Sequence, residues 1–107
     1  MEPIVVGNSL IEEATMIIDR KQHTVGDRRK YIVDYSQWLD TGVTLTAGTA
    51  TTVSLTATVD TVSHTASTLL FFLNGGIINE IFTVALQVTD SNGEIKNDTV
   101  EFNVVAP

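Results

Sequence analysis

Residues 80–105 read EIFTVALQVTDSNGEIKNDTVEFNVV, and this stretch decides the fold of the chain. Apolar residues occupy every second position of its first arm, from Phe82 to Val88, and of its second arm, from Val100 to Val104. A period of two is typical of β-strands with one buried face. Between the arms, Asn92-Gly93 is a pair suited to a turn with positive φ. The stretch therefore predicts an antiparallel hairpin.

A lone hairpin is marginal in water, so its apolar face needs further strands to pack against. The 107 residues are enough for one domain. Alternating or apolar segments predict more strands at 30–35, 43–46, 53–59 and 68–73, with a turn at Gly48. The spacing is typical of an all-β, antiparallel β-sandwich of about six or seven strands. Trp38 is expected to plug one end of its core.

The segment 68–73, TLLFFL, is apolar at nearly every position. Such a run predicts a central strand covered on both faces or a strand at an interface. Gly75-Gly76 follows it closely and permits a tight reversal into the final hairpin.

Residues 1–26 differ in pattern from the rest, so we divide the chain into an N-terminal extension at 1–26 and a sandwich at 27–107. Residues 8–19 fit a helix, since Ser9 and Glu12 match a capping box, but Thr15 to Ile18 fit a strand equally well. The apolar tip Ile4-Val5-Val6 either covers its own sandwich or docks on another subunit. We interpret the extension as a docking arm.

The net charge of −7 is unevenly distributed. Five cations and five acids cancel within residues 1–30, whereas Lys96 faces eight acids in the remainder. An acidic body argues against nucleic-acid binding, which depends on cations that neutralise phosphates. The basic cluster near the N-terminus either meets an acidic protein surface or pairs with acids of its own chain.

No catalytic or metal-binding motif is visible, so we expect a protein that is not an enzyme and has no cofactor. The chain has no cysteine, and its two histidines, His23 and His64, have no second ligand at metal-binding spacing. Both histidines are predicted to lie on the surface. Asp90, Asn92 and Glu94 have the oxygens for calcium, but the same residues favour turns.

Other sequence signals are weak. Asn97-Asp98-Thr99 matches a glycosylation sequon, which we expect to be unused because no secretory signal is apparent. No apolar run approaches the ~20 residues of a membrane helix, so no membrane partner is expected.

The segment Asp34-Tyr35-Ser36-Gln37-Trp38-Leu39 resembles the strand end of an immunoglobulin-like domain in small bacteriophage virion proteins described as fibre-tail adaptors. Segments 71–76, 82–84 and 98–100 are similar to the closing strands of that domain. The resemblance, over about residues 28–105, implies an immunoglobulin-like sandwich located in the virion, in several copies of a symmetric assembly, that binds phage tail, fibre or capsid proteins. A capsid decoration protein and a carbohydrate-binding module with an exposed Trp38 are the alternatives.

For the adaptor, partner contacts are predicted from the apolar residues of the extension, with the basic cluster setting orientation. These candidates are Ile4, Val5, Val6, Leu10, Ile17, Ile18, Arg20, Lys21, Arg28, Arg29 and Lys30.

Overall fold

The computed structural model describes residues 4–6 and 17–107. Leu10 and most of the segment whose helix or strand character the sequence left open, 8–19, lie outside these residues. The described residues form eight strands: β1 (Ile4–Val5), β2 (Ile17–Thr24), β3 (Arg28–Asp34), β4 (Leu45–Thr52), β5 (Ala57–His64), β6 (Thr68–Gly75), β7 (Ile81–Asp90) and β8 (Ile95–Val105).

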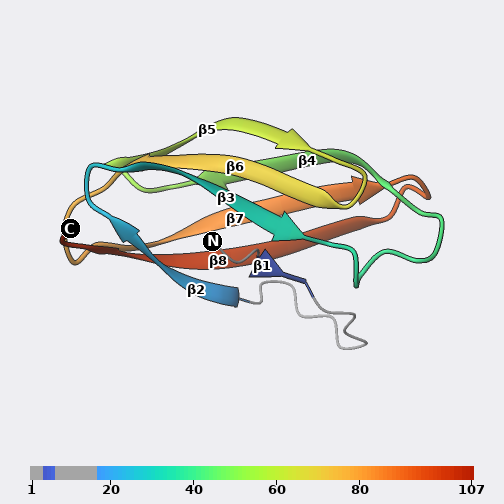
Figure 1. The fold of residues 1–107 in the computed structure, drawn as a ribbon, viewed down its shortest axis with the longest axis horizontal. Coiled ribbons are helices and arrows are strands. Elements are labelled where there is room, and N and C mark those ends of the chain that lie inside the picture. Colours follow the sequence, from blue (N-terminus) through green and yellow to red (C-terminus); the bar gives the residue numbers. More distant parts are fainter. Residues whose placement is uncertain (1–3, 7–16) are drawn as a thin grey trace.

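The strands form two four-stranded sheets, in the orders β1-β3-β6-β5 and β2-β8-β7-β4, which pack as the two layers of a sandwich (Figure 1). The prediction of an all-β sandwich is therefore confirmed. Four strand pairings are antiparallel, but β1 pairs with β3 and β2 with β8 in parallel, so both sheets are mixed. The immunoglobulin-like character of the sandwich stays a prediction.

The predicted hairpin is confirmed as β7 and β8. At its turn Gly93 has φ +83°, the left-handed conformation that glycine adopts without steric cost. The Asp90 carboxylate is 5% exposed and accepts hydrogen bonds at 2.9 Å from the backbone N–H groups of Asn92 and Glu94. Asp90 thus closes the turn with its side chain.

The core lies between the sheets because alternate side chains of each strand point inward. Phe71, Phe102 and Val84 are completely buried. The Trp38 ring meets the Tyr35 ring edge-on, with centroids 6.1 Å apart, and packs partly buried against this core. The prediction that Trp38 covers one end of the core is thereby confirmed.

The turn predicted at Gly48 is wrong, because Gly48 lies inside β4 and faces Val88 of β7. A Cβ at this position would lie 2.6 Å from Cδ1 of Leu69, which is completely buried. The glycine therefore serves close packing between the sheets. The chain reverses further on, at residues 53–56, where Val53 and Leu55 are 87% and 99% exposed.

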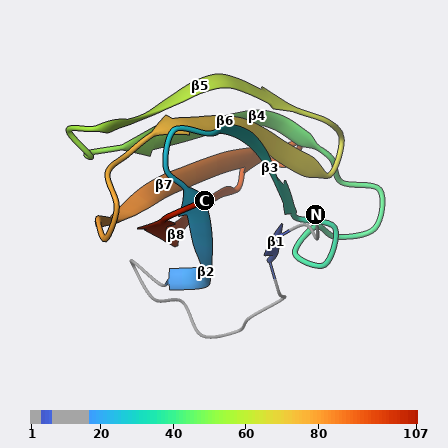
Figure 2. The ribbon, with the colours of Figure 1, turned by 60° about the vertical axis from the view of Figure 1, so that its left-hand side comes forward.

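The first strands belong to the sandwich, which explains why eight strands are found where six or seven were expected. β1 and β2 form the edges of the two sheets on the side opposite β4 and β5 (Figure 2). Ile4 and Val6 are each 1% exposed, within the chain's own core. Among the described residues, the boundary drawn at residue 26 therefore does not separate an arm from the sandwich.

The prediction that His23 lies on the surface is also wrong, since its side chain is completely buried. Its Nδ1 is 2.9 Å from the Tyr31 hydroxyl, and its Nε2 is 3.0 Å from the Asp27 carbonyl oxygen. Both ring nitrogens are thus satisfied, as burial of an imidazole requires. His64 is exposed, as predicted.

Candidate partner-binding surface

Most of the candidate functional residues that the structure describes lie at the surface of the molecule. Over the described residues, no group of three or more His, Cys, Asp or Glu side chains is placed to hold a metal ion. The same residues include no helix that could span a lipid bilayer. The exposure of each candidate residue and the side chains around it decide whether it can contact a partner.

The outer face of the β1-β3-β6-β5 sheet has an apolar centre. In β6, Leu69 and Phe71 point into the core, so Leu70 and Phe72 point outward, and both are partly exposed. Ile32 of β3 lies opposite Leu70 and is also partly exposed. The apolar run of β6 is thus a central strand whose second face is only partly covered. We call Ile32, Leu70 and Phe72 the apolar centre.

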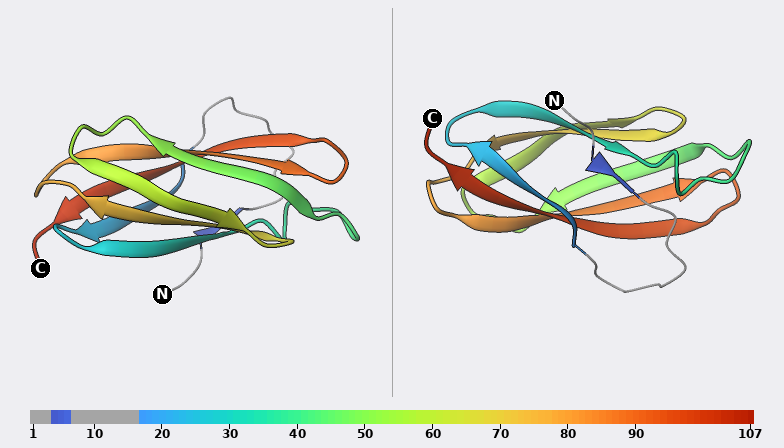
Figure 3. Two further views of the ribbon diagram at one scale, coloured as in Figure 1. Left: turned by 90° about the horizontal axis from the view of Figure 1, so that it is seen from above. Right: turned by 60° about the horizontal axis from the view of Figure 1, so that its bottom comes forward.

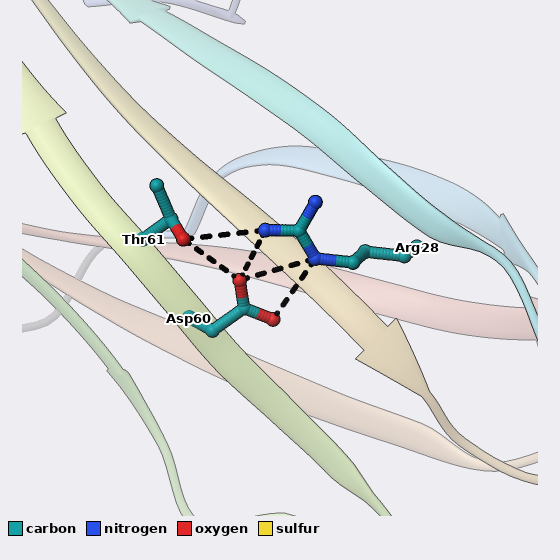
Figure 4. A network of polar contacts seen from close by, with 3 residues as sticks. All are labelled: Arg28, Asp60 and Thr61. Atoms are coloured by element: carbon teal, nitrogen blue, oxygen red, sulfur yellow. Dashed lines mark hydrogen bonds and ion pairs between the residues drawn. The ribbon is translucent and has the colours of Figure 1, made fainter.

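Arg28 crosses the apolar centre from β3 to β5. Its guanidinium carbon lies 4.0 Å from the ring centroid of Phe72, a cation–π contact. Beyond the ring, its Nη2 donates to the Asp60 carboxylate at 2.6 Å and to the Thr61 hydroxyl at 3.2 Å (Figure 4). The arginine, the aromatic ring and the carboxylate therefore form one ordered cluster over β6.

The Arg28 hydrogen bonds lower the pKa of Asp60, so this carboxylate keeps its negative charge to a lower pH than a free aspartate does. The pair is exposed to solvent, where ion pairs contribute little to stability. Its clearest effect is on geometry, because it holds the guanidinium over the Phe72 ring.

Lys30 adds a second cation to the same face. It lies opposite Phe72 in the pairing of β3 with β6 and is exposed. Arg29 is exposed too, but strand alternation places its side chain on the other face of β3, the face of Tyr31. Neither Arg29 nor Lys30 forms an ion pair with any residue that the structure describes. Their charges are available to an acidic partner.

The two other predicted cations lie on the second sheet. Arg20 of β2 faces Glu101 of β8, and its Nε is 3.2 Å from the Glu101 carboxylate. Lys21 Nζ is 3.6 Å from Asp19. The basic cluster of the sequence is thus divided between the two sheets. Three of its cations, Arg20, Lys21 and Arg28, pair with acids of their own chain, which was one of the two alternatives.

The predicted apolar candidates also separate. Ile4 and Val6 are buried in the chain itself and have no surface to offer a partner, whereas Val5 between them is 45% exposed. Ile17 and Ile18 are partly exposed on β2, with Ile18 packed against the core. Because successive side chains of a strand point to opposite faces, Val5 is exposed while Ile4 and Val6 are buried. Three apolar residues in a row do not show in the sequence which of them will be exposed.

Sequence reasoning did not select the apolar centre as a site. The available signal was the unbroken apolar run of β6, for which an interface strand was one of the two predictions. Ile32 gave no such signal, because its exposure depends on which face of β3 packs inward.

Two β-sheets packed face to face, with a charged and apolar outer surface, define this molecule as a β-sandwich protein whose candidate site is a contact surface. Residues 23–103 match the family described as podophage GP4 fiber-tail adaptor protein gp77. The chain belongs to this family. No curated protein matches the chain.

Among solved structures, the chain is similar to part of a 2,6-sialyltransferase from Vibrionaceae Photobacterium sp. JT-ISH-224, crystallised with CMP and lactose. The similarity covers 90% of this chain and 19% of that one, with a TM-score of 0.52 and 16% identity. At this identity the likeness concerns the fold alone.

Proposed function

We propose that this chain is a non-enzymatic structural component of a podophage virion that joins a tail fibre to the tail. The observation that carries the proposal is the family match over residues 23–103. That match favours a position at the tail over one on the capsid surface. Several copies, arranged around the symmetry axis of the tail, act together.

The contact surface proposed for one partner is the outer face of the β1-β3-β6-β5 sheet. Protein interfaces combine an apolar centre with a polar rim, and the charges of the rim set orientation and partner choice. Here the apolar centre is bordered by Lys30 and by Arg28 with its Asp60 partner. A partner with carboxylates around an apolar patch would complement this face.

The proposal keeps some of the contacts predicted from the sequence and leaves others out. Val5 lies at the edge of the proposed face, where it pairs with Asp34 of β3. Arg29 is left out, because strand alternation turns its side chain to the opposite face of β3 from Lys30. Ile4 and Val6 act indirectly, because their burial fixes β1 to β3.

Two substitutions with the same change in charge test this surface. Lys30→Gln and Gln87→Glu each lower the net charge of −7 by one, but Gln87 lies on β7, in the other sheet. Each variant is produced in place of the native protein in the phage that encodes it, and its amount per purified particle is measured. Affinity for the purified tail and fibre proteins of that phage is measured in parallel.

Lys30→Gln is expected to weaken binding to one of the two partners by about three- to tenfold, with a smaller salt dependence, whereas Gln87→Glu leaves binding unchanged. Absence of the native protein from purified particles would refute the proposed function. Equal binding by both variants would refute the assignment of the surface alone.

A further inference from the structure

Five strongly exposed aliphatic side chains gather at one end of the sandwich. This end holds the β4–β5 and β6–β7 connections, which Figure 3 shows together near the C-terminus. The exposed fractions are Val53 87%, Leu55 99%, Ile77 58%, Ile78 49% and Ile81 64%. We call these five residues the apolar end. It lies apart from the apolar centre on the outer face of β6.

Glu80 ties the two connections together. Its carboxylate accepts a hydrogen bond from the Ser54 hydroxyl at 2.7 Å and another from the Thr56 hydroxyl. It also accepts one from the backbone N–H of Ile77 at 3.3 Å. The two hydroxyl bonds lower the pKa of Glu80, Thr56 having the larger effect, so the carboxylate is charged at neutral pH. Each residue of the apolar end lies within three positions of Glu80, Ser54 or Thr56.

Backbone contacts fix the same two connections. The Gly76 N–H donates to the Thr56 carbonyl oxygen at 3.0 Å. Ser54 Oγ accepts from the backbone N–H groups of Thr56 and Ala57, at 3.2 and 3.0 Å. The loops are thus held in one shape while Val53 and Leu55 point into solvent. Binding loops that are already ordered lose less entropy on association.

A second copy of this chain is a poor occupant for the apolar end. Its five side chains expose on the order of 500 Å² of apolar area, which is below the ~800 Å² per partner of a standard stable interface. In segments 24–29, 52–57 and 75–81, the charged side chains are the carboxylates of Asp27 and Glu80 and the cations Arg28 and Arg29, of which Arg28 pairs with Asp60. Local charge at this end is therefore mixed, but two chains that each carry −7 repel each other.

We propose that the apolar end docks into an apolar groove of a different protein in the same particle, with Leu55 and Val53 inserted as anchors. The partner must also contact residues around the apolar end, because about 500 Å² is only the centre of a typical interface. This inference rests on the proposed function, since an adaptor needs two separate contact surfaces. The outer face of β6 serves one partner and the apolar end serves the other.

Site-specific photo-crosslinking identifies the occupant. A benzoylphenylalanine is introduced at Leu55 and, as a control, at Ile95, which is 59% exposed where β8 begins, after the β7–β8 turn. Phage particles that contain each variant are irradiated, and crosslinked species are identified by mass spectrometry. We expect Leu55 to crosslink to a different virion protein and Ile95 to give no comparable product.

Three results would overturn the inference. They are a Leu55 crosslink to a second copy of this chain, equal products at both positions, and absence of a Leu55 product in particles that contain the protein. Failure of the native chain to appear in particles would refute the proposed function instead, so the two failures are distinguishable.

A binding measurement gives an independent test. The double variant Val53→Ser with Leu55→Ser is compared with Ile95→Ser for affinity to the purified virion protein found by crosslinking. We expect at least a tenfold loss for the double variant and no change for the control. Because all three side chains are exposed, thermal unfolding is expected to be the same for both variants, and equal affinity would contradict the inference.

Discussion

The side chains of His23 and Tyr31 join the two sheets, with imidazole Nδ1 2.9 Å from the phenolic oxygen. β2 carries the histidine on one sheet, and β3 carries the tyrosine on the other. Burial favours the uncharged imidazole, in which Nε2 donates to the Asp27 carbonyl oxygen and Nδ1 accepts from the Tyr31 hydroxyl. The buried histidine is therefore neutral, and it links β2 to the interior of the sandwich.

Acidification is expected to weaken this link. Burial lowers the pKa of His23 below its ordinary value of 6.5, with smaller opposing effects from Asp27. The unfolded chain then binds a proton more readily, so the contribution of His23 is complete above about pH 6.5 and is lost as the pH falls toward the lowered pKa. Urea unfolding at pH 7.5 and 5.5 measures the change in the free energy of unfolding.

His23→Gln should show a smaller loss of stability between these two pH values than the native protein, because it lacks this titration. His64→Gln, at an exposed position, should retain the native pH dependence. A native-like pH slope in His23→Gln would contradict the assignment.

Burial of the N-terminal tip gives a second prediction. Ile4 is 1% exposed within the core, and the neighbouring Val5 is 45% exposed on the other face of β1. Ile4→Ala should lower the free energy of unfolding by about 2–4 kcal/mol, whereas Val5→Ala should cost under about 1 kcal/mol. Chemical denaturation of both variants measures the difference.

Removal of residues 1–26 should destabilise the sandwich more than Ile4→Ala does. It deletes β1 and β2 together with the buried Ile4, Val6 and His23. The total stability of a domain is only about 5–15 kcal/mol. If the truncated chain unfolds at the same denaturant concentration as the full chain, β2 is not a stabilising part of the fold.

The sequence predicts the hairpin well and β2 poorly, for a physical reason. β7 and the second half of β8 alternate strictly because one face of each is buried there. In β2, IIDRKQHT, charged residues occupy the middle, since this edge strand buries little beyond His23. Its position is set by parallel pairing with β8, which the segment itself does not encode.

The candidate surfaces show the same limit. A cluster of cations in the sequence predicts a basic surface, yet Arg20 and Lys30 lie on different sheets. Conversely, Ser54 and Glu80 are far apart in the chain, and only the fold brings their side chains to 2.7 Å. Pairings between distant segments therefore decide which exposed residues form one surface.

A buried carboxylate provides the fourth prediction. Asp98 is 4% exposed, accepts a hydrogen bond from the Tyr35 hydroxyl at 3.4 Å, and lies 3.1 Å from Lys96 Nζ. Burial, with a further effect of Asp98, raises the pKa of Tyr35, so the phenol stays protonated and donates. Asp98→Ala leaves both partners unsatisfied and should cost about 2–4 kcal/mol.

Tyr35→Phe removes only the donor of a long hydrogen bond and should cost about 1 kcal/mol. Gln87→Ala serves as the exposed control and should stay within about 0.5 kcal/mol of the native protein. Thermal and urea unfolding rank the three variants. Equal losses for Asp98→Ala and Gln87→Ala would show that the buried carboxylate does not stabilise the fold.

Two glycines with similar backbone angles but different surroundings give the last prediction. Gly75 has φ +90° and Gly42 has φ +80°, so alanine is strained at both positions. At Gly75 a Cβ would also lie 2.7 Å from the Thr56 carbonyl oxygen, whereas at Gly42 no atom lies within 4 Å. Gly42→Ala should cost about 1 kcal/mol and Gly75→Ala about 2–4 kcal/mol, measured by urea unfolding.

The same variants should differ in binding. A Cβ at position 75 would push Thr56 away and so separate the two connections that Glu80 joins. Gly75→Ala should therefore also weaken binding through the apolar end, while Gly42→Ala should not. Equal losses of stability for the two variants would show that the 53–56 loop moves away from the added Cβ at no cost and is therefore not held in one shape.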